Sequence, residues 1–165
     1  MPDSTLRSLL ILFVLATLSL AVNAQESLFI LASQHKLAGT QVNDEMIQNA
    51  DLINVIAPMW LRAGDDGAVS LFPEITGNVD QFIHTAHQYQ IKTWPIVGNF
   101  APQALLANPQ AIERCVNELQ QWCALHQVDG LVVDFEHLDS NSAAPLTAMV
   151  TSLRTRLDAH GMQLS

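Results

Sequence analysis

Residues 129–136, which read DGLVVDFE, place two carboxylic acids two positions apart at the end of an apolar run. Side chains in a β-strand alternate between its faces, so Asp134 and Glu136 are expected to share one face and the interleaved apolar residues the other. The carboxyl ends of buried parallel strands are where α/β enzymes place their active sites. Two acids in a confined space do not ionise together readily, so one is expected to hold a proton near neutral pH. A proton donor beside a carboxylate suits glycosidic-bond cleavage. The alternative is a pair of solvated acids at a strand end.

The segments around this strand alternate between strand-like and helix-like patterns, as βα units around a parallel sheet do. Apolar runs predict strands at residues 28–32, 52–57, 91–97, 131–135 and 162–165. Apolar residues at helical spacing predict helices over residues 79–86, 112–123 and 146–157. Asn108 followed by Pro109 is typical of a helix start, and Gly161 of a helix end. The pattern fits either a small open α/β domain or the first half of a larger closed one.

The DGLVVDFE octet resembles the fourth-strand signature DGxDxDxE of glycoside hydrolase family 18, the chitinase-like enzymes. It matches at Asp129, Gly130, Asp134 and Glu136 and departs at Val132, where the family usually carries an acid.

Two further segments carry the resemblance. Residues 51–71 are similar to the family's second strand and following hairpin, and residues 91–100 to its third strand. The likeness is greatest to the bacterial branch that includes spore-germination and cortex-degrading enzymes. It implies a (β/α)8 TIM barrel, of which this chain would hold about the first four to five βα units and, alone, be inactive.

The resemblance also implies roles for the two acids. Glu136 would be the general acid that protonates the leaving oxygen, and the nucleophile would be the substrate's own N-acetyl carbonyl. Asp134 would position the acetamido group and stabilise the oxazolinium-like charge. Val132 cannot relay charge as the family's first acid does.

Three residues at the ends of predicted strands are candidates for sugar binding. Trp60 follows the second strand, where its indole could stack on a sugar ring or, equally, cover the barrel rim. Asn99 and Phe100 follow the third strand and are expected to line the cleft.

The N-terminus has the pattern of an export signal. Arg7 precedes an apolar run over residues 9–22, and small residues lead to Ala24. The run is shorter than the roughly 20 residues that cross a bilayer, so a cleaved signal is favoured over a membrane anchor. Residues 1–24 are therefore predicted to be a signal peptide and residues 25–165 a partial catalytic domain, secreted or periplasmic and without a membrane anchor.

Several other residues have simpler interpretations. Cys115 and Cys123 are eight positions apart on one predicted helix, about 12 Å of rise and too far for a disulfide. Residues 64–67 (GDDG) predict a hairpin turn rather than a calcium site. His84 and His87 are expected to be solvated. No metal and no cofactor is expected.

Composition narrows the function classes. The 165 residues are 49% hydrophobic and carry 7 basic and 16 acidic side chains, a formal net charge of -9. This excludes a disordered polymer and argues against binding to nucleic acid or to an anionic membrane.

The expected partner is a carbohydrate polymer or oligosaccharide with N-acetyl groups. The sequence thus predicts an exported glycosidase of β-linked N-acetylglucosamine glycans, chitin-like or peptidoglycan-like. A non-catalytic glycan-binding module on the same fold, or an open α/β domain without sugar chemistry, are the alternatives.

Overall fold

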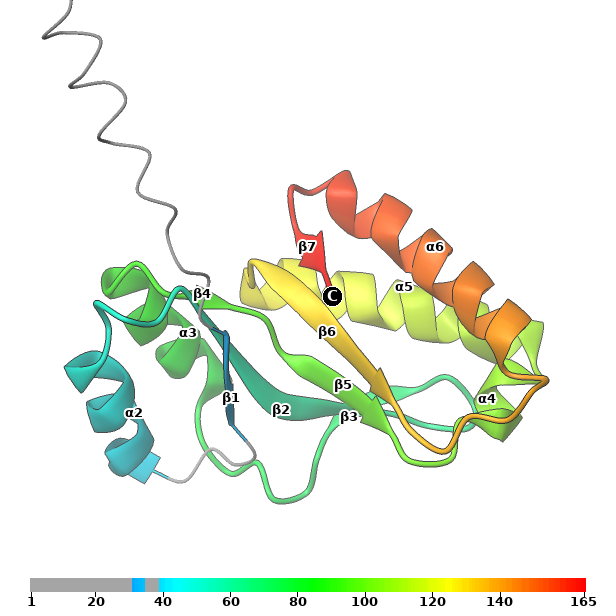
Figure 1. Ribbon diagram of the computed structural model, residues 1–165, viewed down its shortest axis with the longest axis horizontal. Helices are drawn as coiled ribbons and strands as arrows, with labels where there is room; N and C mark the ends of the chain where they lie inside the picture. The colour runs from blue at the N-terminus through cyan, green and yellow to red at the C-terminus, as the bar shows by residue number, and fades with distance from the viewer. Residues whose placement is uncertain (1–30, 35–38) are drawn as a thin grey trace, which may run out of the picture.

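Strands and helices alternate along residues 31–34 and 39–165, the part of the chain that the computed structural model describes (Figure 1). The strands are β1 (Leu31–Gln34), β2 (Val55–Ala63), β3 (Val69–Leu71), β4 (Lys92–Thr93), β5 (Ile96–Asn99), β6 (Gly130–Phe135) and β7 (Gln163–Leu164). The helices are α2 (Gly39–Gln48), α3 (Val79–Gln88), α4 (Gln103–Leu106), α5 (Pro109–His126) and α6 (Ala143–Asp158). The predicted signal segment at residues 1–24 lies outside the described residues, as does most of the strand predicted at 28–32.

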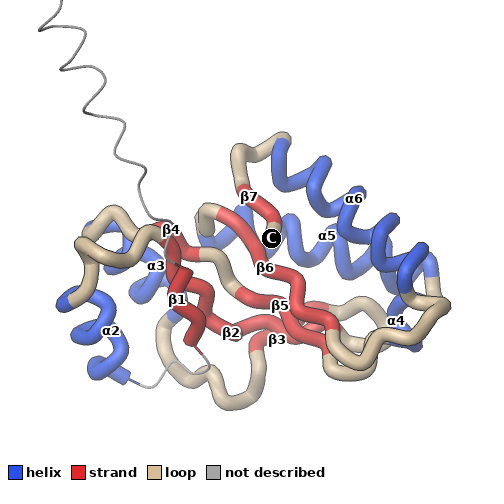
Figure 2. Tube along the Cα trace, viewed as in Figure 1, coloured by secondary structure: helices blue, strands red, loops and turns tan. Residues whose placement is uncertain are grey.

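The strands form a parallel sheet in the order β1-β2-β5-β6-β7. β4 also pairs with β2 in parallel, while β3 pairs with β2 antiparallel. Figure 2 shows the strands as one twisted layer, with α5 and α6 lying along it. Helix α3 contacts both α2 and α5, and α5 contacts α6, so the helices form a continuous layer of their own. The predicted α/β class with a parallel sheet is confirmed.

The core lies between the sheet and these helices. Trp60 of β2 is fully buried and packs edge-on against Phe82 of α3 and Trp122 of α5, with ring centroids 5.4 and 6.4 Å away. Leu131 of β6 and Leu119 of α5 are also fully buried in the same cluster. The apolar stripes predicted for the helices therefore face the sheet.

Helix α5 begins as its sequence predicts. The Asn108 side chain accepts the backbone N–H groups of Gln110 and Ala111, and Pro109 occupies the first turn, where its missing N–H costs no hydrogen bond. Neither buried cysteine of this helix is in a disulfide. Burial raises the pKa of both thiols to about 12, so they stay protonated at neutral pH.

The second strand is longer than its sequence pattern indicates. Residues 52–57 were expected to form it, with Pro58 at its end, but β2 continues to Ala63. Its register against β5 shifts between Met59 and Leu61, a β-bulge of the kind that lets a strand continue past a proline. The strand therefore reaches the same edge of the sheet as the carboxyl ends of β5 and β6, where Arg62, Gly98 and Asp134 lie in register.

A hairpin joins β2 to β3, as residues 64–67 predict. The N–H of Gly64 donates to Ala68 O, Asp66 Oδ1 accepts the N–H of Ala68, and Gly67 has φ +82°.

None of the helices in the described part of the chain is long and apolar enough to span a membrane.

Candidate active site

Strand β6 presents its two faces to different surroundings. Leu131 is fully buried and Phe135 is 9% exposed, and both belong to the core beneath the helices. Val133, between them on the same face, is half-buried but packs against this core. Val132 and Asp134 alternate with these residues and are also half-buried, and Val132 is not among the residues packed against the core. The Glu136 side chain, directly after the strand, is 43% exposed. The two candidate acids therefore lie on the face of β6 turned away from the helices.

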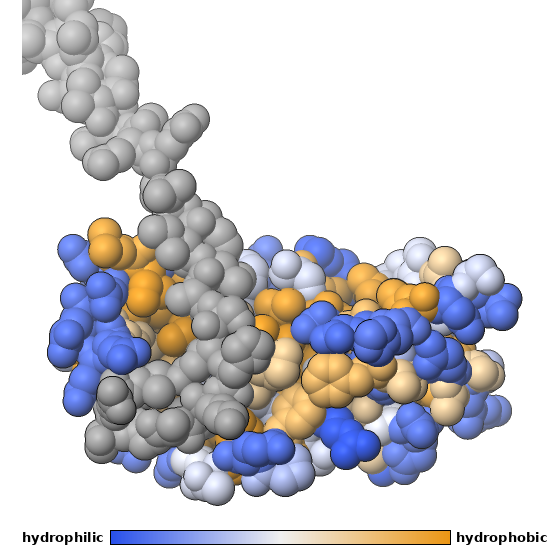
Figure 3. Space-filling view, turned by 60° about the horizontal axis from the view of Figure 1, so that its bottom comes forward, coloured by the Kyte–Doolittle hydropathy of each residue, from blue (hydrophilic) through white to orange (hydrophobic). Residues whose placement is uncertain are grey.

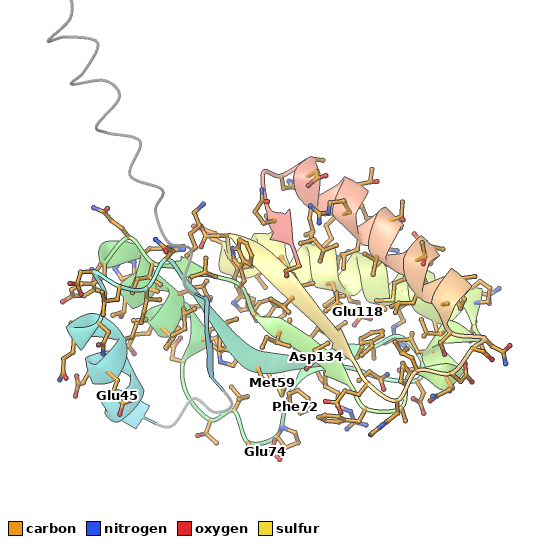
Figure 4. The ribbon with its side chains drawn as sticks, viewed as in Figure 1. Glu45, Met59, Phe72, Glu74, Glu118 and Asp134 are labelled. Carbon is orange, nitrogen blue, oxygen red and sulfur yellow. The ribbon has the colours of Figure 1, made fainter. Side chains whose placement is uncertain are left out.

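Phe72 is a neighbour of Asp134 that the sequence did not single out. Asp134 pairs in register with Gly98 of β5, and a Cβ built on Gly98 would lie 3.5 Å from Cζ of Phe72. The Phe72 ring therefore covers Gly98, beside Asp134. Figure 4 shows Phe72, Asp134 and Met59 in the same region of the sheet, with Glu74 farther out. The hairpin carries Phe72 there, and its N–H donates to Trp60 O at 2.8 Å.

Phe72 and Phe100 form an aromatic pair near the end of β5. Their ring centroids are 6.3 Å apart, and Phe100 is 51% exposed. An exposed ring face can stack on the C–H face of a sugar. Phe100 follows β5 directly and has Phe72 as its aromatic partner. Figure 3 shows the lower side of the molecule, where pale-orange apolar side chains lie in the middle and hydrophilic side chains around them.

The structure corrects the prediction for Trp60. Its side chain has no exposed area and packs against α3 and α5, on the helix side of β2. A ring enclosed in this way has no face free for a sugar. The alternative weighed from the sequence was hydrophobic cover over the barrel rim; the structure instead places Trp60 in the core between β2 and the helices.

Asn99 is also not an open lining residue. It is 7% exposed, its Nδ2 donates to Ala63 O at 3.1 Å, and its Oδ1 accepts the N–H of Ala101 at 2.9 Å. Both ends of the amide are used within the protein. Its backbone carbonyl accepts the N–H of Glu136 at 3.0 Å. Asn99 therefore shapes the loops around the candidate acid.

The first two residues of the octet lie at the other end of β6 from the acids. Asp129 Oδ2 accepts the backbone N–H of Thr93 and lies 2.8 Å from Nε2 of His87. A Cβ on Gly130 would lie 2.7 Å from Gln163 O and 2.9 Å from the Trp94 ring. Asp129 and Gly130 thus join β6 to its neighbours. His87, expected to be solvated, is one of Asp129's partners.

The loop after Glu136 is ordered by Asp139. Ser142 Oγ donates to Asp139 Oδ1 at 2.7 Å and the N–H of Asn141 donates to the same atom at 2.9 Å. These bonds, the Ser142 hydroxyl first, hold the pKa of Asp139 below its usual value. A shallow depression of about 220 Å³ lies between this loop and α4, with Gln103 and Pro145 among its lining residues.

Among the described residues, no group of three or more His, Cys, Asp or Glu side chains is placed to hold a metal ion. His84 interacts with Gln88 of the same helix at 3.1 Å.

Solved structures of two chitinases and of a spore cortex-lytic enzyme share this arrangement of strands and helices. The spore cortex-lytic enzyme SleL of Bacillus megaterium QM B1551 matches 82% of this chain over 33% of its own, with a TM-score of 0.70 and 17% identity. A class V chitinase from Pseudomonas fluorescens Pf-5 matches 82% over 43% of its own chain, with a TM-score of 0.70 and 17% identity. A chitinase from Chromobacterium violaceum ATCC 12472 matches 81% over 44%, with a TM-score of 0.66 and 18% identity.

No protein-family model matches the chain, and no curated protein matches it. The chain spans between 33% and 44% of the length of the three chitinase-like structures above. At this identity the likeness is one of fold. The chain thus has the fold of part of a chitinase-like (β/α)8 barrel, with Asp134 and Glu136 at the carboxyl end of one of its strands.

Proposed function

We propose that this chain carries the catalytic acids of an exported glycosidase that cleaves β-linked N-acetylglucosamine glycans, chitin-like or peptidoglycan-like. The observation that carries the proposal is the position of Asp134 and Glu136. The two acids are two residues apart at the end of β6, so both lie on the face of the strand that is turned away from the helices. The chitinase-like fold supports the substrate class, since three solved structures with this fold are named chitinases or a cortex-lytic enzyme.

The proposed reaction assigns a proton to Glu136. The Glu136 carboxylic acid donates its proton to the glycosidic oxygen as the bond to the anomeric carbon breaks. The carbonyl oxygen of the substrate's acetamido group forms the new bond to that carbon, giving an oxazolinium. Asp134, as a carboxylate, accepts the acetamido N–H and stabilises the positive charge. Glu136 then takes a proton from water, which opens the ring with overall retention.

Phe100 and Phe72 would contribute binding rather than chemistry. Their rings lie at the ends of β5 and β3, near the acids, and offer apolar faces to a pyranose ring. Asn99 would act through the backbone of Glu136, whose N–H it binds. No step of this reaction needs a metal ion or a cofactor.

The test is hydrolysis of N-acetylglucosamine oligosaccharides by the product of the complete reading frame that contains this sequence. Glu136→Gln should lower kcat at least about 100-fold, the usual contribution of a general acid, and Asp134→Asn should also lower it. Glu45→Gln, which removes an exposed carboxylate on α2, is the matched control and should leave hydrolysis unchanged. The first product detected by NMR should be the β-anomer, and a thiazoline analogue of the oxazolinium should inhibit.

Two outcomes would overturn the assignment. Unchanged hydrolysis by Glu136→Gln would remove the acid from its role. Binding of the oligosaccharide without hydrolysis by the unmodified protein would favour a glycan-binding module on the same fold.

Export is tested separately, by N-terminal sequencing of the protein released from cells, which should begin after Ala24.

A further inference from the structure

The backbone on both sides of the Glu136 Cα is held by hydrogen bonds from other elements. The N–H of Glu136 donates to the carbonyl of Asn99, at the end of β5, at 3.0 Å. The carbonyl of the next residue, His137, accepts Nε2 of Gln103 in α4 at 2.5 Å. The segment that carries the proposed acid is thus fixed before and after it.

His137 has a backbone conformation that needs such support. Its φ is +49°, in the left-handed region that residues other than glycine rarely occupy. A conformation of this kind persists where the surroundings hold it, and it is found often at functional sites. The Gln103 hydrogen bond is made to the carbonyl of this residue, directly where the chain turns away from β6.

Gln103 lies in a segment that is held in place by packing and by hydrogen bonds. It begins α4, whose Leu105 is fully buried and whose Leu106 is 4% exposed. The preceding turn is held by Asn99, whose side chain binds both Ala63 O and the N–H of Ala101. The ends of β2, β5 and β6 are therefore linked into one hydrogen-bonded unit around Glu136.

The Glu136 side chain depends on this backbone for its position. It is 43% exposed, and its Oε2 lies 4.0 Å from Nε2 of His137, too far for a hydrogen bond. An exposed side chain is located by its backbone more than by packing. We propose that Gln103 is a positioning residue, which sets Glu136 for proton donation through the His137 carbonyl. This inference rests on the proposed function.

The proposal has a kinetic signature that a general loss of structure does not produce. A general acid has to lie within hydrogen-bond reach of the leaving oxygen, so a shift of about 1 Å lowers proton transfer. A sugar alkoxide is strongly basic and leaves only when it is protonated to the hydroxyl, whereas the weakly basic dinitrophenolate leaves without a proton. Loss of Gln103 should therefore slow oligosaccharide hydrolysis and spare a dinitrophenyl glycoside.

The experiment compares three variants of the protein from the complete reading frame. Gln103→Glu keeps the shape but replaces the N–H donor with an acceptor, and Gln103→Lys restores a donor. Gln121→Glu adds the same charge at an exposed position on α5 as a control. We expect Gln103→Glu to lower kcat on an N-acetylglucosamine oligosaccharide about 10- to 100-fold, with KM changed less than about twofold. Its kcat on the dinitrophenyl glycoside should stay within about twofold, and Gln103→Lys should keep most of the oligosaccharide activity.

Several results would overturn the proposal. Equal losses on both substrates would mean a structural role for Gln103, and no loss on the oligosaccharide would mean no role. A loss in Gln121→Glu as large as in Gln103→Glu would assign the effect to charge. If the unmodified protein hydrolyses neither substrate, the proposed function fails and takes this inference with it. If hydrolysis depends on Glu136 but not on Gln103, only the inference fails.

Discussion

Asp129 holds Thr93 by a hydrogen bond from the Thr93 backbone N–H to Asp129 Oδ2, 2.8 Å long. The same oxygen lies 2.8 Å from Nε2 of His87, on α3. Asp129 immediately precedes β6, whereas Asp134 and Glu136 lie at the other end of that strand. The three acids of the octet therefore have different positions. Asp129 joins the start of β6 to neighbouring elements, whereas Asp134 and Glu136 lie at the carboxyl end of the strand, in the candidate active site.

Asp129→Ala should destabilise the protein without changing the proposed chemistry. The variant leaves the Thr93 N–H, in a fully buried residue, without its acceptor, which costs about 1–3 kcal/mol of unfolding free energy. Asp129→Asn keeps a carbonyl acceptor and should cost less. Urea unfolding monitored by tryptophan fluorescence measures the difference. Asp158→Ala, at an exposed site, is the control. Unchanged stability with lost activity in Asp129→Ala would instead place this residue in the active site.

Local sequence patterns predicted α3, α5 and α6 and the alternation along β6 because these depend on neighbouring residues, whereas α2 and α4 were not predicted. Asn108 and Pro109 start α5 with groups that lie within one helical turn, and the two-residue period of a strand fixes which side chains share a face. The bulge in β2 was not predicted, since a register shift between Met59 and Leu61 depends on the partner strand.

The site was predicted in part for the same reason. The acids share a strand, so their common face followed from the sequence. The position of Phe72 did not, because the hairpin folds it back onto Gly98 of another strand. For Trp60 both interpretations were open, and its contacts with Phe82 and Trp122 come from two helices distant in the sequence. Contacts between distant segments are what the sequence alone left undecided.

Phe72→Leu should weaken glycan binding. Leucine keeps apolar contact with Gly98 but removes the aromatic face, so affinity for an N-acetylglucosamine oligosaccharide should fall about 3- to 10-fold, and Phe72→Tyr should keep it. Isothermal titration in a Glu136→Gln background separates binding from hydrolysis. Tyr89→Leu, which removes an exposed ring just after α3, is the matched control. Equal affinity for Phe72→Leu and the parent would exclude Phe72 from the binding surface.

Gly67→Ala should destabilise the hairpin far more than Gly161→Ala destabilises the end of α6. Both glycines have positive φ, +82° and +72°. A Cβ on Gly67 would lie 2.0 Å from Ala111 O, whereas a Cβ on Gly161 would meet nothing within 4 Å. Gly161→Ala should cost about 1 kcal/mol for backbone conformation alone, and Gly67→Ala about 2 kcal/mol or more because the hairpin must also move off α5. Urea unfolding of the two variants tests this order. Similar losses would show that the hairpin moves off α5 without cost.

Glu118 ties β3 to α5 and should make stability depend on acid pH. Its Oε2 accepts the N–H of Val69 at 2.7 Å and its Oε1 accepts Nε of Arg114 at 2.7 Å. The Val69 hydrogen bond, followed by Arg114, holds the pKa of Glu118 below its usual value of 4.5. A carboxyl with a lower pKa in the folded state stabilises the fold above pH 4.5, and this contribution is lost as the pH falls through the folded-state value.

Glu118→Gln should therefore be less stable than the parent protein at neutral pH, with a difference that shrinks as the solution is acidified below pH 4.5. The neutral amide can still accept the Val69 N–H, so the variant isolates the charge. Urea midpoints across a pH series measure the difference, and Glu45→Gln, an exposed carboxylate on α2, shows how much any lost charge contributes. A difference that stays constant from neutral to acid pH would mean that Glu118 stabilises the hairpin by packing and not by its charge.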